Sequence, residues 1–150
     1  MGPFASHMQA ALDEARAAAD RGEVPVGAVI ARPGGSILAA AGNRTRERND
    51  PTAHAEVLAI RAACARLGAE RLTGLDLFVT LEPCAMCAAA ISHARIGRLY
   101  FGAADPKSGG VEHGPRFFMQ PTCHHSPEVY GGIAEREAAT LLQSFFAARR

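Results

Sequence analysis

Runs of apolar positions alternate with polar breaks along the chain, and their spacing changes between helical and extended. Segments with helical spacing or high alanine content predict helices, and short apolar or β-branched segments predict strands. A further helix opens at Glu82-Pro83, where the missing donor of proline costs nothing. The other expected helices span Gln9–Arg21, Ala53–Leu67 and Ala134–Ala148, and the expected strands span Val24–Ala31, Ile37–Ala41, Leu75–Thr80 and Arg98–Ala103. This alternation predicts an α/β/α layered sheet.

Residues with special backbone preferences mark the ends of these elements. Gly22 and Gly68 stand where two helices are expected to stop. Thr52 stands where its hydroxyl could cap the second helix. Between residues 111 and 132 the pattern is irregular, and only a short turn near Arg116–Met119 is predicted there.

The size of the chain and its hydropathy indicate one domain. With 150 residues it has about the modal domain size, and it shows no internal repeat or linker. Met1–His7 resembles residues left by an expression vector ahead of a native start at Met8, so we expect the single domain to span residues 8–150. Hydrophobic residues make up 48% of the chain, but no run reaches the roughly 18 apolar residues of a membrane span. We therefore expect a soluble cytoplasmic protein without a membrane partner.

The cysteine count and the net charge narrow the chemistry. Four cysteines could form two disulfides, a pattern that suits small secreted scaffolds, but two of the four are three positions apart behind a proline. Thiolates on a metal in a reducing compartment fit this spacing better. The net charge is only +1, so any site for a polyanion must be local.

The candidate chemistry lies in His54 and Glu56, followed later by Cys84 and Cys87. One imidazole and two thiols can hold zinc on three corners of a tetrahedron and leave the fourth for water. His54 and Glu56 fall at one expected helix start and the two cysteines at another, and the partial positive charge of a helix start favours thiolates. A Cys-x-x-Cys pair is also typical of structural zinc half-sites and redox pairs. A structural site needs a fourth protein ligand, however, and a redox pair has no use for the histidine and the glutamate.

His-x-Glu followed by Pro-Cys-x-x-Cys is the signature of zinc-dependent nucleobase deaminases. Over nearly all of the chain from Met8, the sequence resembles the bacterial tRNA-specific adenosine deaminases of the cytidine deaminase-like superfamily. The likeness is carried by residues 23–28, 43, 50–56, 80–87 and 95–102 and by the Phe-Phe-x-x-Arg-Arg ending. The resemblance implies a three-layer α/β/α fold with a mixed sheet of about five strands, one zinc per subunit, a homodimer, and the anticodon loop of tRNA as partner.

The resemblance also implies the reaction, which is hydrolytic deamination of adenosine to inosine at the wobble position. A zinc-bound water would attack C6 while Glu56 carries its proton to N1 and then to the departing ammonia. Glutamate in a first helical turn can also be simple dipole chemistry, and that alternative stays open for Glu56.

Further residues are candidates for substrate contact. Asn43 could pair with a purine edge, or it could be an ordinary turn residue. Asp105 and Lys107 stand where the family borders its substrate channel, or in a turn introduced by Pro106. Phosphate contacts could come from the arginines of the polar loop and of the C-terminus, which are equally typical of solvated surface: Arg44, Arg46, Arg48, Arg149 and Arg150.

Two other cysteine positions receive simpler interpretations. Cys123, His124 and His125 are consecutive, and three ligands in a row cannot easily close one tetrahedron, so packing or RNA contact is favoured there. Cys64 lies on an apolar helical stripe and is interpreted as a buried thiol.

Two rival functions remain beside the leading one. Deamination of a free base or nucleoside, such as guanine or cytosine, would use the same chemistry and suits the near-neutral net charge. A non-catalytic, zinc-stabilised RNA-binding subunit would not need Glu56, which is present. The segment Glu112–His125 differs from many family members, so the details of substrate framing stay open there.

Overall fold

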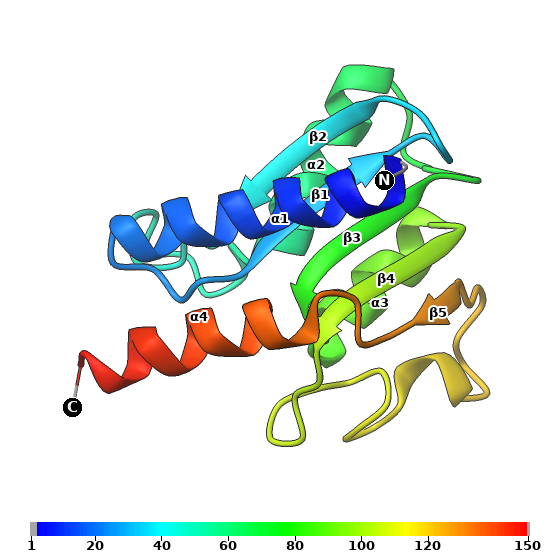
Figure 1. The fold of residues 1–150 in the computed structure, drawn as a ribbon. Coiled ribbons are helices and arrows are strands. Elements are labelled where there is room, and N and C mark those ends of the chain that lie inside the picture. The colour runs from blue at the N-terminus through cyan, green and yellow to red at the C-terminus, as the bar shows by residue number, and fades with distance from the viewer. Residues whose placement is uncertain (1–2, 150) are drawn as a thin grey trace.

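Five strands form one mixed sheet, and helices cover both of its faces (Figure 1). The computed structural model describes residues 3–149. The order across the sheet is β2-β1-β3-β4-β5, in which β1 is antiparallel to β2 and β3, while β3, β4 and β5 run parallel. This confirms the predicted three-layer fold with a mixed five-stranded sheet. The strands are β1 (Gly27–Ala31), β2 (Ile37–Gly42), β3 (Asp76–Leu81), β4 (Arg98–Ala103) and β5 (Glu128–Tyr130).

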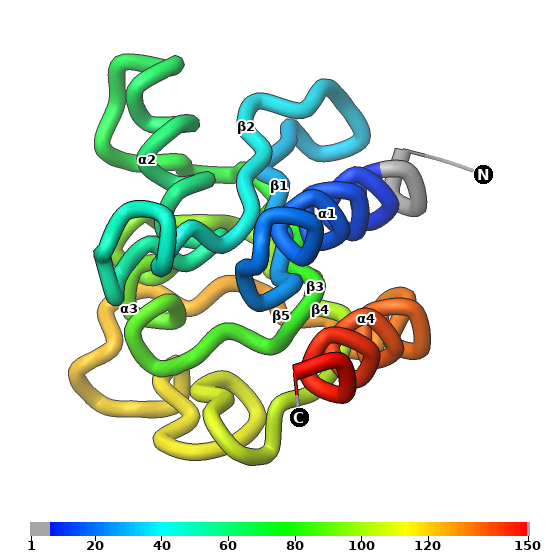
Figure 2. Tube along the Cα trace, turned by 90° about the vertical axis from the view of Figure 1, so that its left-hand side faces the viewer, coloured from blue at the N-terminus to red at the C-terminus, as the bar shows by residue number. Residues whose placement is uncertain are grey.

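Four helices form the two outer layers. Figure 2 shows α2 and α3 on one side of the strands and α1 and α4 on the other. Each pair covers its own hydrophobic cluster, one on each face of the sheet. The helices are α1 (Pro3–Asp20), α2 (Ala55–Leu67), α3 (Ala85–Ala94) and α4 (Glu135–Ala147).

The central strands are buried on both faces, which explains their continuous apolar runs. In β3, Leu77 belongs to the cluster under α2 and α3, whereas its neighbour Phe78 belongs to the cluster under α1 and α4. In β1, Ile30 and Val29 are divided in the same way. Because side chains alternate along a strand, covering both faces requires apolar residues at consecutive positions.

Helix α1 begins at Pro3, six residues before the predicted start at Gln9. Proline is tolerated at a helix start because its missing N–H would have no helical acceptor there. His7 and Met8 are buried, and the His7 ring meets Phe78 edge-on with centroids 5.2 Å apart. Part of Met1–His7 is therefore packed on the sheet. Its origin in an expression vector, and a domain spanning 8–150, stay predictions.

Helix α2 begins at Ala55, and the prediction that Thr52 caps it is wrong. The backbone N–H and the hydroxyl of Thr52 both donate to Asp50 Oδ1, at 2.8 and 2.7 Å. The N–H of Ala55 instead donates to Asn43 Oδ1 at 2.8 Å, and His54 takes the N-cap position. The capping oxygen comes from twelve residues earlier in the chain, which local spacing could not reveal.

The irregular segment holds one strand that the sequence pattern did not predict. β5 has three residues, and its two outer ones are exposed, so it lacks the apolar pattern of a central strand. The predicted turn near Arg116–Met119 is present as a short 3₁₀ helix at Phe117–Met119. Among residues 3–149, no helix combines the length and the apolar character needed to cross a membrane.

Candidate active site

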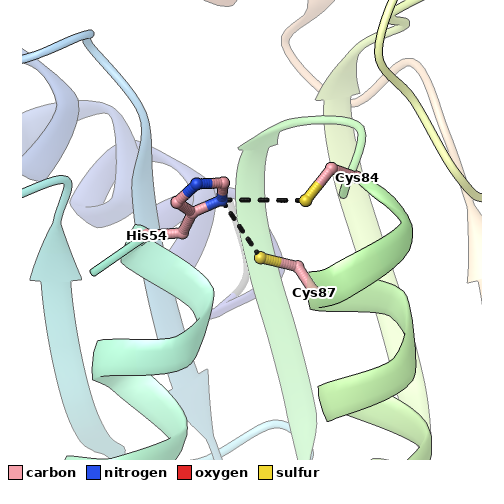
Figure 3. Close-up of side chains that lie close together, drawn as sticks. All are labelled: His54, Cys84 and Cys87. Atoms are coloured by element: carbon pink, nitrogen blue, oxygen red, sulfur yellow. Dashed lines mark hydrogen bonds between the residues drawn. The ribbon is translucent and has the colours of Figure 1, made fainter. Parts of the chain in front are cut away.

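The candidate metal ligands come together at the end of the sheet where β2, β3 and β4 end. His54 is the N-cap of α2, Cys84 is the N-cap of α3, and Cys87 lies in the first turn of α3. Figure 3 shows the imidazole facing both sulfur atoms across the gap between the helices. The Nδ1 atom of His54 lies 3.7 Å from Sγ of Cys84 and 3.4 Å from Sγ of Cys87. The two helix starts therefore bring the three candidate ligands together.

The spacing of these three atoms fits zinc. Ligands at 2.0–2.3 Å from a tetrahedral ion lie about 3.5–3.8 Å from one another. The measured separations fall close to this range, and all three ligand atoms lie within 4.8 Å of one another. One nitrogen and two sulfurs are ligands that zinc prefers, and three protein ligands leave a fourth corner open. The cluster can thus hold a catalytic rather than a structural ion.

The ionisation of the two thiols is strongly coupled. A hydrogen bond from Cys87 and the nearby His54 lower the pKa of Cys84 to about 4. The same contact with Cys84, together with burial, raises the pKa of Cys87. Each sulfur thus acts on the ionisation of the other, and a divalent cation would favour ionisation of both because metal ligands must be deprotonated.

Glu56 lies in the first turn of α2, one residue after Ala55, and only 4% of it is exposed. Burial raises the pKa of its carboxyl to about 7, with the charge of Cys84 acting in the same direction. A carboxylate placed only for helix-dipole stabilisation would stay solvated. Glu56 instead lines the same pocket as His54 and Cys84, where it can exchange protons near neutral pH.

A pocket of about 250 Å³ opens beside the metal cluster. The pocket lies at the end of the sheet where β2, β3 and β4 end and β1 begins. The lining mixes apolar and polar side chains that come from segments far apart in the sequence. They are Val24, Val26, Asn43, Thr45, His54, Glu56, Leu81, Glu82, Cys84, Asp105 and Ser108.

A larger groove of about 760 Å³ adjoins this pocket. The two hollows share Val24, Leu81, Asp105 and Ser108. The rest of the groove is lined by Ala104, Lys107, Leu142, Phe146 and Arg149, from the loop after β4 and from the C-terminal part of the chain. Phe146 is 49% exposed, and the guanidinium of Arg149 lies 3.5 Å above the ring of Phe145. The groove thus offers an aromatic surface and cations beside the candidate catalytic centre.

The predicted substrate residues are divided between the two hollows. Asn43 lines the pocket, Lys107 and Arg149 line the groove, and Asp105 lines both. The Asp105 carboxylate also accepts the N–H groups of Lys107 and Ser108, which agrees with the turn expected around Pro106. Arg150 lies outside the described residues.

The arginines of the 44–48 loop lie elsewhere. Arg44 and Arg48 line a separate hollow of about 390 Å³ together with Arg61. Arg44 is paired with Glu47 at 2.7 Å, and Arg46 is exposed. These arginines line neither the pocket nor the groove, and their contact with phosphate stays a prediction.

The remaining cysteines lie outside the metal cluster. The thiol of Cys123 donates a hydrogen bond to the carbonyl of His125 and lies near the hydroxyls of Ser92 and Ser126. The Nε2 atom of His125 is hydrogen-bonded to the carbonyl of Ile96 at 2.7 Å. These contacts agree with a packing role. Cys64 is partly buried against the core under α2.

Two buried acids at the site were not recognised from the sequence. Glu23 and Glu82 are each only 2% exposed, and each accepts hydrogen bonds from backbone amides of a loop that lines the pocket. Their signal in the sequence was an acidic residue directly beside an apolar strand. That signal is weak on its own, since the amide donors are far away along the chain.

Known proteins with similar sequences and folds share this site region. Residues 4–103 match the family described as the cytidine and deoxycytidylate deaminase zinc-binding region. A tRNA-specific adenosine deaminase from Agrobacterium fabrum is 63% identical over 95% of this chain and 93% of its own. A solved structure from studies of A-to-I editing by tRNA wobble-position deaminases has a TM-score of 0.89 and 64% identity, and covers 91% of this chain and 99% of its own.

A guanine deaminase from Bacillus subtilis is more distant. It is 32% identical, with a TM-score of 0.67, over 99% of this chain and 94% of its own. The larger likeness is therefore to the tRNA deaminases, and it extends past the zinc-binding region into the C-terminal part that forms the groove. The chain belongs to the cytidine and deoxycytidylate deaminase family and, within it, to the tRNA-specific adenosine deaminases.

Proposed function

We propose that the protein converts adenosine to inosine at the wobble position of a tRNA anticodon loop, with water consumed and ammonia released. The observation that carries this proposal is the buried Glu56 beside the His54, Cys84 and Cys87 cluster, in a pocket that opens into an aromatic and basic groove. The 63% identity to a tRNA-specific adenosine deaminase supports the choice of substrate.

His54, Cys84 and Cys87 would hold one zinc ion per subunit. When bound, zinc supplies a Lewis acid that lowers the pKa of water to about 7. Glu56 accepts a proton from the attacking water and delivers it to N1 of the purine as the C6–O bond forms. It then takes the proton of the new C6 hydroxyl and delivers it to the amino group, so that the C6 carbonyl forms as the C6–N bond breaks and ammonia leaves. Each proton is thus moved by one buried carboxylate that is not itself a metal ligand.

Asn43 would orient the base with its carboxamide. Its Oδ1 atom accepts the N–H of Ala55, which fixes the orientation of the side chain, and its amide nitrogen can donate to a purine nitrogen. The oxygen keeps a second lone pair, so the contact with a donor and an acceptor both used on the base stays a prediction.

The adjoining groove favours RNA over a free base. A wobble adenosine must be turned out of its loop into the pocket, and its neighbours then need a surface beside it. Phe146 offers a face for stacking, and Lys107 and Arg149 offer positive charge. A free base would fill only the smaller pocket.

The assembly and location follow from this substrate. A domain of this size has little surface with which to enclose an RNA loop, so we propose a homodimer in which loops of both copies frame the substrate. Because tRNA is modified where it is made and used, we propose that the protein acts in the cytoplasm.

The direct test offers the purified protein an anticodon stem-loop with a wobble adenosine and, in parallel, free adenine, guanine and cytosine. We expect inosine in the RNA and no ammonia from the free bases, measured by mass spectrometry of nucleosides and by ammonia release. Ammonia from a free base with unchanged RNA would replace this proposal with the free-base alternative.

A variant separates catalysis from binding. Glu56→Ala is expected to keep zinc and to bind the stem-loop while turnover falls by about 10²–10⁴-fold, the usual contribution of a positioned acid or base. Near-parental turnover in this variant would remove Glu56 from the mechanism and support a role for the chain as a binding subunit.

A further inference from the structure

We infer that Glu23 and Glu82 are positioning residues, each of which uses a buried carboxylate to hold one of two loops that line the pocket. This inference rests on the proposed function for its kinetic consequences. Neither side chain is a metal ligand in the cluster, and each collects donors from one loop only.

Glu23 holds the loop that follows β2. Its Oε1 accepts the N–H of Arg46 at 3.2 Å and its Oε2 accepts the N–H of Glu47 at 2.8 Å. The hydroxyl of Thr45 donates to Oε1 at 3.5 Å, and Thr45 itself lines the pocket. Asn43, at the start of this loop, is held by its carbonyl, which accepts from the Arg21 guanidinium at 2.9 Å. The loop that carries Asn43 is thus held by two side chains, those of Arg21 and Glu23.

Glu82 holds the loop that follows β4. Its Oε1 accepts the N–H of Asp105 at 2.9 Å, and its Oε2 accepts those of Glu112 and His113 at 2.8 and 3.1 Å. Val111 N–H contributes a further bond at 3.2 Å, and the His113 ring nitrogen lies 2.7 Å from Oε1. One carboxylate therefore gathers both ends of the segment that contains Ser108.

The packing around Glu82 leaves this loop few other positions. A Cβ atom on Gly109 would lie 2.5 Å from Glu82 Oε2, and one on Gly110 would lie 2.5 Å from the backbone nitrogen of Ala85. Gly110 also donates to the carbonyl of Pro83 at 2.8 Å. Because only glycine allows such an approach, the loop is pressed against the start of α3.

A carboxylate suits this task because it accepts several N–H groups and donates none. Glutamine has nearly the same shape but places an NH₂ group among these donors. Replacing glutamate by glutamine should release one loop while leaving the size of the side chain nearly unchanged. The two loops should respond separately, since Glu23 and Glu82 accept hydrogen bonds from different residues.

The test uses Glu23→Gln and Glu82→Gln in the zinc-loaded full chain, with Glu70→Gln and Glu112→Gln as matched controls. Glu70 and Glu112 are exposed, and among residues 3–149 neither carboxylate takes part in a hydrogen bond or an ion pair, so each control removes one carboxylate charge and keeps both anchored loops, including the bond from the Glu112 backbone N–H to Glu82. Amide hydrogen exchange of the parent and the four variants is followed by mass spectrometry.

We expect a reciprocal pattern. Glu23→Gln should speed exchange at least about 10-fold in residues 43–50 and leave 104–114 at the parental rate, and Glu82→Gln should do the opposite. Both controls should match the parent. Equal loosening of both segments in either variant, or no loosening in either, would overturn the inference. If a glutamine variant does not fold, His113→Ala and Glu23→Asp should give the same local pattern at smaller amplitude.

Kinetics distinguish positioning from a loss of folded protein. In both glutamine variants kcat/KM for the stem-loop should fall by about 10- to 100-fold, mainly through KM, with zinc content unchanged. Unfolding of a fraction of the molecules would lower kcat and leave KM as it was, which would contradict positioning. If the parent itself does not convert the stem-loop, the proposed function fails, whereas the exchange pattern needs no turnover and decides the anchoring by itself.

Discussion

The metal centre and the adjoining groove lie side by side but are built in different ways. The centre takes its ligands from two short motifs, each at the start of a helix: His54 from one, and Cys84 and Cys87 from the other. The packing of α2 beside α3 then brings His54 to 3.7 Å from Cys84, although the two residues are 30 positions apart in the sequence. The groove takes Lys107 from a loop and Phe146 from α4. The ligands of the centre can therefore be recognised from short motifs, whereas the lining of the groove has no such motif and is defined only in the folded chain.

The strongest way to separate the two regions is to remove a metal ligand. Cys87→Ala should abolish zinc binding and lower turnover by more than about 10³-fold, because two protein ligands cannot hold a catalytic zinc firmly. Zinc content measured by atomic absorption and inosine formation should fall together. Cys64→Ala is the matched control, since Cys64 lies outside the metal cluster. Full zinc content in Cys87→Ala would contradict the ligand assignment.

The groove can be tested without touching the centre. Phe146→Ala should raise KM for the stem-loop about 10-fold and leave kcat and zinc content near parental values, since stacking on one base contributes about 1–3 kcal/mol. Steady-state kinetics measure both constants. Met119→Ala, which removes an even more exposed side chain outside the groove, serves as control. A fall in kcat at unchanged KM would place Phe146 in the catalytic step instead.

Acid should weaken the loop that Glu23 holds. Burial alone raises the pKa of Glu23, but the amides of Glu47 and Arg46 outweigh it, and the pKa lies below the ordinary 4.5. The stabilisation is then fully present above pH 4.5 and is lost as pH falls through the lower folded-state pKa. Thermal midpoints of the parent and Glu23→Gln should differ at pH 7 and converge as the pH falls below the folded-state pKa of Glu23. A gap that widens in acid would reverse the sign.

The smallest effect is expected from one groove cation. Lys107→Ala should weaken stem-loop binding by a few fold, and the slope of log K against log salt should decrease by about 1 if Lys107 neutralises a phosphate. Fluorescence binding at several salt concentrations measures this slope. Arg32→Ala is a suitable control, because Arg32 is exposed in the turn after β1, whereas the groove lies at the other end of the strands, where β1 begins. An unchanged slope would leave Lys107 as a solvated side chain.

Local patterns predicted the strands of the sheet less completely than they predicted the metal cluster. The cluster was predictable because Cys84 and Cys87 are one helical turn apart and His54 stands at another helix start. β5 was missed because its three residues lack an apolar face. The capping role of Asn43, and the amide donors of Glu82 between 23 and 31 residues away, depend on contacts that only the folded chain creates.

The cap that Asn43 gives to α2 has a consequence for how readily this pocket can evolve. One side chain both caps the helix that presents Glu56 and lines the pocket, so a substitution at position 43 that reshapes the pocket also weakens the scaffold. Aspartate would keep the capping oxygen but lose the donor. Libraries aimed at other nucleobases should therefore hold position 43 constant and diversify positions such as Ser108, whose changes carry no such linked penalty.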